Sequence, residues 1–304
     1  DSVTSIGEYA FYYCESLKSI TIPESVTIIE KYAFFGCKSL KSVTIPKGIT
    51  SIDDSVFSES KSLKSVTIPK GVTSIGNEAF YFCENLTSIT IPDSVTSIGE
   101  YAFYGCSGFN GTLTLPANLT ELGSNAFRGC VNFTGGIVVP EGITNINQGV
   151  FSGMRNVTSL VLPESLTFIY TFYTDSDHPF YNMVQVEEIT FNSVAVPAIQ
   201  RYTPFPNMTN LKTVHVPDAA VGDYIRAFRA YMPKNARISS ESMLEDYYIQ
   251  DGVLLAYYGE GTEFTIPEGV TEIGDYVFYN RTALQRVTMP DTVTKIGAYA
   301  FRDC

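Results

Sequence analysis

A short motif recurs along this chain at nearly constant spacing, and it constrains the fold more than any other feature. The motif reads L-x-x-V/I-x-I-P-x-x-V-T-x-I-G-x-x-A-F-x-x-C, as in residues 17–37 and 86–106. One such unit cannot bury its apolar face alone, so successive copies are predicted to stack into a solenoid. Each copy contains an apolar residue followed by proline, and the first seven of these dipeptides follow one another at steps of 23 or 24 residues. They are Ile22-Pro23, Ile45-Pro46, Ile68-Pro69, Ile91-Pro92, Leu115-Pro116, Val139-Pro140 and Leu162-Pro163, and the same dipeptide returns at Ile266-Pro267 and Met289-Pro290.

Each copy predicts one short strand followed by an irregular or helical return segment. Ile20 and Ile22 alternate with Ser19 and Thr21, so the isoleucines are expected to point inward and the hydroxyls outward. Pro23 ends the strand because it has no N–H to donate. Parallel pairing of these strands would build one long sheet. The fold class predicted is therefore a leucine-rich-repeat solenoid of the repeat α/β type, with about 23 residues per coil.

Two further slots of the motif carry specific expectations. The glycine slot, for which we expect a positive φ, holds Gly7, Gly76, Gly99, Gly123, Gly274 and Gly297, with Asp53 and Asn147 as substitutes. The phenylalanine slot is predicted to form an internal stack of rings; it holds Phe11, Phe34, Phe57, Phe80, Phe103, Phe127, Phe151, Phe278 and Phe301.

All six cysteines share one slot of the motif. Parallel Cβ vectors in stacked coils hold neighbouring Cβ atoms too far apart for a disulfide. We therefore expect free, buried thiols at Cys14, Cys37, Cys83, Cys106, Cys130 and Cys304.

The repeating unit resembles that of BspA-like, Treponema-type leucine-rich-repeat proteins. The resemblance rests on IPxxVTxIGxxAFxxCxxLxxV and is close over residues 1 to about 170 and 262–304. It implies a bacterial protein that is secreted or lies at the cell surface, a role in attachment to host matrix proteins or other cells, and no catalytic residues.

The repeat is irregular in the middle of the chain. We expect a regular array over residues 1–170, irregular repeats over 171–240 and a second regular segment over 241–304 that continues the first. Residues Leu162 to Phe191 span 29 positions, about six too many, which predicts an excursion that projects from the solenoid. Helical spacing of Tyr224, Ala227, Phe228 and Tyr231 predicts a short amphipathic helix. The pair Asp251-Gly252 predicts a tight turn between two strands.

Composition and motifs argue against several classes of function. A net charge of -12 disfavours nucleic acid and anionic lipid surfaces as partners. No apolar run is long enough to cross a membrane, and no targeting signal is expected in this segment. Asp175, Asp177 and His178 could ligate a cation, but their spacing fits no established loop, so a solvated loop is favoured. With no nucleophile motif beside His215, no catalytic residue, metal or cofactor is predicted.

Two surfaces are candidates for binding a partner. The first is the outward hydroxyl face of the predicted sheet, formed by Ser19, Thr21, Ser42, Thr44, Ser65, Thr67, Ser88, Thr90 and Thr114. The second is the excursion, with Phe172, Tyr173, Asp175, Asp177 and His178.

The function predicted from the residues and the resemblance is a non-enzymatic extracellular adhesion module that binds a matrix protein, another surface protein or a glycan, as a monomer. A structural spacer that displays another domain is the alternative. A solenoid enzyme is disfavoured, since it would need charged residues clustered on one sheet face where this chain carries Ser and Thr.

Overall fold

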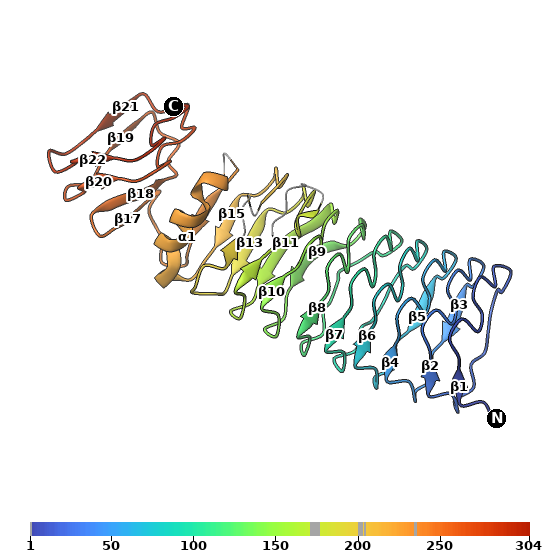
Figure 1. The fold of residues 1–304 in the computed structure, drawn as a ribbon. Coiled ribbons are helices and arrows are strands. Elements are labelled where there is room, and N and C mark those ends of the chain that lie inside the picture. The colour runs from blue at the N-terminus through green and yellow to red at the C-terminus, as the bar shows by residue number, and fades with distance from the viewer. Residues whose placement is uncertain (1, 171–176, 200–202, 204, 234–235) are drawn as a thin grey trace. The chain divides into compact units, whose positions relative to one another are not determined.

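The computed structural model describes residues 2–170, 177–199, 203, 205–233 and 236–304. It is a parallel β-solenoid with about 23 residues per coil, which confirms the predicted fold class (Figure 1). The described residues form two compact units, one of residues 1–189 and 197–211, the other of residues 190–196 and 212–304.

Strands of the first unit form at two positions of the coil, in several short parallel sheets rather than in the single long sheet that was predicted. The strands of the V-T-x-I segment form three sheets: β1 (Ser5–Ile6) with β2 (Ile28–Ile29); β4 (Ser51–Ile52), β6 (Ser74–Ile75), β7 (Ser97–Ile98) and β8 (Glu121–Leu122); and β10 (Asn145–Ile146), β12 (Phe168–Ile169) and β14 (Ala198–Ile199). At the position before the proline, β3 (Ser42–Thr44) pairs with β5 (Ser65–Thr67), and β9 (Thr134–Val138) pairs with β11 (Asn156–Leu162). β13 (Glu188–Phe191) lies where the first unit gives way to the second.

Threonine explains why the V-T-x-I segment forms a ladder of its own. The Thr73 backbone N–H donates to the Thr50 carbonyl of the preceding coil at 2.9 Å, and the Thr73 hydroxyl reaches the same oxygen at 3.2 Å. Thr96 repeats both contacts on Thr73, at 2.8 and 3.3 Å. The backbone N–H and the side-chain hydroxyl of each of these threonines therefore both donate to the preceding coil.

The phenylalanine slot forms the predicted internal stack. Consecutive rings from Phe11 to Phe151 lie 5.0 to 6.5 Å apart between centroids and are nearly parallel. Phe34, Phe57 and Phe80 are fully buried. Such offset stacks add to the burial of apolar area, so this column is the centre of the core.

The prediction of positive φ in the glycine slot is wrong, and close packing is the actual constraint. The positive φ values fall two and six residues later, as at Glu78 (55°) and Phe82 (51°), where successive tight turns carry the chain around the coil. At Gly99 an added Cβ would lie 2.6 Å from the Asn77 backbone nitrogen. The Asn77 side chain accepts a hydrogen bond from the Glu100 N–H there, at 2.8 Å, which leaves no room for a side chain.

The cysteine slot is confirmed as free thiols, with one correction at its ends. All six cysteines are unpaired, and Cys37, Cys83, Cys106 and Cys130 are buried, whereas Cys14 and Cys304 are exposed. In the interior coils the thiol donates to a phenylalanine carbonyl, as from Cys106 Sγ to Phe80 O at 3.1 Å. Cys14 and Cys304 belong to the first and last described coils, each of which has one described neighbouring coil.

The second unit combines short repeats with a helix. Its elements are β15 (Thr213–His215), η2 (Asp218–Ala220), α1 (Val221–Phe228), η3 (Arg229–Tyr231), β16 (Arg237–Ser239), β17 (Tyr247–Gln250), β18 (Val253–Tyr257), β19 (Glu263–Thr265), β20 (Glu272–Ile273), β21 (Arg286–Thr288) and β22 (Lys295–Ile296). β17 and β18 form the predicted antiparallel hairpin, with positive φ at Asp251 (51°) and Gly252 (77°).

Helix α1 is present as predicted, but its buried face is displaced. Tyr224, Ile225 and Phe228 are buried, while Tyr231, expected on the same face, is 45% exposed. The α-helix ends at Phe228, and the tighter 3₁₀ turn that follows rotates Tyr231 away from the core. No helix of the described residues is long and apolar enough to cross a membrane.

Candidate functional site

The predicted hydroxyl face is exposed, as expected. Ser19, Thr21, Ser42, Thr44, Ser65, Thr67, Ser88, Thr90 and Thr114 are all accessible on the strand side of their coils. In β3 and β5 the hydroxyls alternate with buried Val43 and Val66. This face carries only short neutral groups, and a binding role for it stays a prediction.

Only the end of the predicted excursion lies within the described residues. Phe172, Tyr173 and Asp175 lie outside the described residues. From Asp177 the chain is again in register with the preceding coil, because the Gly149 N–H donates to the Asp177 carbonyl at 2.9 Å and the Phe151 N–H to the Pro179 carbonyl at 3.0 Å.

The two described residues of the excursion do not project into solvent. His178 is buried, with 2% of its surface exposed, so it is not the accessible side chain that was predicted. The Asp177 carboxylate lies 3.0 Å from the Arg128 guanidinium. The interior position arises because His178 occupies the slot that Gly149, itself buried, occupies one coil earlier. No group of three or more potential metal ligands occurs among the described residues.

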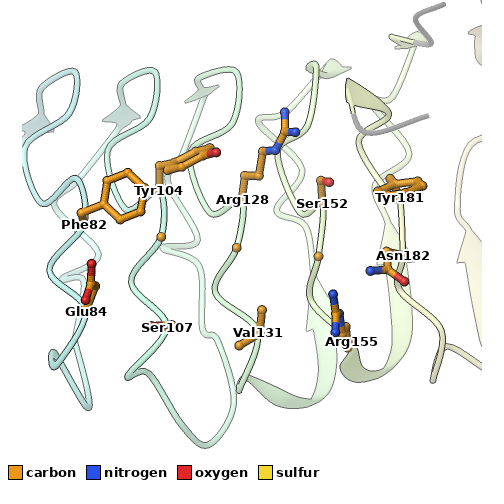
Figure 2. Close-up of a pocket in the computed structure, with 13 residues that line it drawn as sticks. Phe82, Glu84, Tyr104, Ser107, Arg128, Val131, Ser152, Arg155, Tyr181 and Asn182 are labelled. Carbon is orange, nitrogen blue, oxygen red and sulfur yellow. The ribbon is translucent and has the colours of Figure 1, made fainter. Parts of the chain in front are cut away.

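A groove that was not predicted lies beside this point, in the turn segments of the first unit (Figure 2). It has a volume of about 480 Å³. Its floor is a row of glycines, Gly105, Gly129 and Gly153, one from each of three successive coils. All three have positive φ, of 71°, 78° and 85°. We call this feature the glycine groove.

The glycine groove exists because these three coils place no side chain of their own in this slot, although the Phe82 ring reaches over Gly105, where an added Cβ would lie 2.7 Å from it. Phe82 fills the slot at one end and Asn182 at the other, with φ of 51° and 61°. Left-handed backbone is therefore tolerated there by other residues, and what the glycines add is a slot without a side chain of its own. A Cβ at Gly129 would meet only the Gly105 backbone, at 3.5 Å.

Two rows of side chains form the rims of the glycine groove (Figure 2). One row consists of Tyr104, Arg128, Ser152 and Tyr181, and the other of Glu84, Ser107, Val131 and Arg155. The rim therefore combines two aromatic rings, two guanidinium groups and one carboxylate around an uncharged floor.

Arg128 is held in place at the centre of its row. Its guanidinium lies 3.0 Å from Asp177 Oδ1, 3.1 Å from Asn125 Oδ1 and 5.9 Å from the Tyr104 ring centroid. The first contact joins positions 49 residues apart in the chain. An ordered arginine beside a tyrosine is the composition typical of energetically important contacts at protein interfaces.

The backbone of the groove floor is already hydrogen-bonded. The Gly105 N–H donates to the Arg128 carbonyl at 2.8 Å, and the Gly129 N–H to the Ser152 carbonyl at 2.9 Å. A ligand in the groove would therefore be recognised by the rim side chains and by shape, and not by adding a strand to the ladder.

Comparison with known proteins agrees with the repeat and its geometry. The model of the BspA type leucine-rich-repeat region, in six copies, matches residues 1–110, 73–193, 135–241 and 254–304. A search of proteins with curated function found no match.

Among solved structures, a leucine-rich-repeat protein from Bacteroides ovatus is 23% identical, with 99% of this chain and 80% of that chain covered and a TM-score of 0.46. A leucine-rich-repeat protein of T. pallidum is 29% identical over 55% of this chain and 78% of that chain, with a TM-score of 0.49. A leucine-rich cell surface protein from Faecalibacterium prausnitzii is 23% identical, with 94% and 83% covered and a TM-score of 0.39. Since the family model spans most of the sequence, the chain belongs to the BspA-type leucine-rich-repeat family.

Proposed function

We propose that this chain is a non-enzymatic binding module of a bacterial cell-surface or secreted protein, and that the glycine groove receives an extended segment of a partner protein. The observation that carries the proposal is the row Gly105, Gly129 and Gly153, which hollows the surface across three consecutive coils between Phe82 and Asn182. The cell-surface description of the F. prausnitzii relative supports the location.

The dimensions of the groove fit a short stretch of polypeptide. Phe82 and Asn182 are four coils apart, and coils stacked at about 4.8 Å place them roughly 19 Å from each other. An extended chain rises about 3.3 Å per residue, so about six residues would span this length. Tyr104 and Tyr181 would contact apolar side chains of the segment, and Arg155 and Glu84, near opposite ends, would favour one direction of the chain.

A variant that fills the groove tests the proposal against the predicted hydroxyl face. Purified chain would be assayed by surface plasmon resonance against a panel of extracellular-matrix proteins and glycans. Gly129→Phe copies the residue that Phe82 already places in this slot, so we expect a folded protein with binding reduced at least tenfold. Ser65→Glu with Thr67→Glu is the matched variant on the hydroxyl face.

The outcomes separate the candidate surfaces. Loss of binding in the Gly129→Phe protein alone supports the glycine groove. Loss in the hydroxyl-face variant alone moves the binding site to the strand side, and binding restricted to glycans overturns the assignment of a protein partner. Absence of binding to the whole panel favours the spacer alternative, in which the coils only display another domain.

A further inference from the structure

Three arginines of the second unit converge on one buried tyrosine. The guanidinium carbons of Arg229, Arg237 and Arg281 lie 5.6, 5.7 and 6.0 Å from the Tyr258 ring centroid. They come from η3, from β16 and from the turns after β20. Tyr258 is fixed, because its hydroxyl accepts a hydrogen bond from the Ile238 N–H at 3.1 Å. We call Arg229, Arg237 and Arg281 the arginine cluster.

The positive charge of the arginine cluster is only partly compensated within the described part of the chain, by the carboxylates of Asp246 and Glu260 near Arg237 and Arg281. Arg229 is only 5% exposed, and its Nε and Nη2 have no acceptor there. The Nε atoms of Arg237 and Arg281 are also buried without an acceptor there. The acid nearest to a guanidinium is Asp246, 3.8 Å from Arg237, too far for a hydrogen bond. A buried guanidinium without an acceptor is strongly unfavourable.

Tyr258 does not supply the missing negative charge. Burial raises the pKa of the Tyr258 phenol, although the three arginines oppose this shift, so the phenol is neutral at neutral pH. The arginines remain charged in the same range, because a guanidinium does not deprotonate in proteins. The cluster therefore presents guanidinium N–H donors that protein groups leave unsatisfied.

A cavity of about 360 Å³ opens beside the arginine cluster, and it also carries acceptors. Its lining includes Arg237, Tyr258 and Arg281 together with the carboxylates Asp246 and Glu260. The volume lies at the small end of the range for small-molecule sites. Guanidinium forks match a carboxylate, and the two acids can accept hydrogen bonds from hydroxyl groups.

We propose that this cavity binds an acidic sugar, with the ligand carboxylate on Arg237 and Arg281, which line it, and its hydroxyls on Asp246 and Glu260. A glutamate or aspartate side chain offers the same carboxylate but no hydroxyl donors, so it satisfies only half of the lining. The proposal is independent of the glycine groove, which belongs to the first unit.

The Nε–H signals of arginine in a ¹⁵N NMR titration report on the cluster directly. We expect free glucuronate to shift the Nε–H signals of Arg237 and Arg281, which line the cavity, and glucose, its uncharged analogue, to leave them unmoved. Arg281→Gln should weaken glucuronate binding at least tenfold. Arg302→Gln is the matched control, since Arg302 lies 5.3 Å from the Tyr299 ring at the exposed end of the same unit.

A second variant separates loss of binding from loss of folding. Arg237→Met removes a charge that lines the cavity while keeping most of the side-chain volume, so the thermal midpoint should change little while the response to glucuronate disappears. Equal responses to glucuronate and to N-acetylglutamate amide would overturn the assignment of a sugar. Absence of any response at 50-fold excess, or an unchanged affinity in the Arg281→Gln protein, would overturn the site itself.

Discussion

Replacement of Phe80 by alanine tests the stacked core most directly. Phe80 is fully buried, and its ring lies 5.5 Å from that of Phe57 and 5.2 Å from that of Phe103. Loss of burial and the resulting cavity cost about 3–5 kcal/mol. Since two ring contacts disappear as well, each worth about 0.5–1.5 kcal/mol, we expect a value near the upper end.

This loss should be visible as a lower melting temperature. In a cooperative unit of about 200 residues, each 1 kcal/mol lowers the midpoint by about 2–4 °C, so a loss of about 5 kcal/mol predicts a fall of about 10–20 °C. The assay is thermal unfolding followed by circular dichroism and calorimetry. Phe80→Leu, which restores most of the apolar volume, should recover more than half of the fall.

Phe11→Ala provides the matched control for this experiment. Phe11 occupies the same slot in the first coil, is half-buried and has one ring neighbour in the stack, Phe34 at 5.0 Å. Its replacement should cost less than half as much as that of Phe80. An unchanged midpoint for Phe80→Ala, or equal falls for the two variants, would refute the stacking argument.

Three further predictions follow from the packing of the coils. Gly99→Ala should destabilise the protein by about 1–3 kcal/mol in urea unfolding, because the added Cβ would meet the backbone of the preceding coil. Gly7→Ala should be neutral, because the nearest atom to its added Cβ is a carboxylate oxygen at 3.9 Å. Equal effects of the two changes would contradict the close-packing explanation. Cys14 and Cys304 should react with a thiol reagent in the native protein, and all six cysteines only after unfolding, so rapid native reaction of six thiols would show that the core is open. Burial raises the pKa of the Cys37 thiol to about 11. Because the folded-state pKa is raised, the stabilising contribution of the neutral thiol is complete below about pH 9 and is lost as the pH rises toward 11. The urea midpoint should therefore fall less steeply between about pH 9 and 11 in Cys37→Ala than in the parent chain.

The periodic features of this protein were predictable from its sequence. A residue that recurs at each coil must meet its own counterpart in the next coil, so the slot of Phe80 implied a ring stack and that of Cys106 implied a row of thiols. The helix at Tyr224 and the turn at Asp251 could also be predicted from the sequence, because local residue spacing and turn preference determine them. The glycine groove could also have been found, since Gly105, Gly129 and Gly153 recur at a constant step of 24.

Other features depended on the path of the backbone around the coil. The repeat alone places Gly99 in a slot but does not show whether conformation or space excludes a side chain, and here the Asn77 backbone decides. The burial of His178 follows from the register in which residues 177–180 pair with residues 149–151 of the preceding coil, and no local sequence pattern predicts this register.

The arginine cluster shows most clearly what only the tertiary structure decides. Arg229, Arg237 and Arg281 occupy unrelated positions, and no period relates the first two to the third. They meet because the irregular helical segment brings Arg229 to the Tyr258 ring, where Arg281 of a regular coil also lies. Sequence periodicity predicts contacts between equivalent residues of stacked coils, whereas contacts between unlike residues arise from how the irregular segments pack.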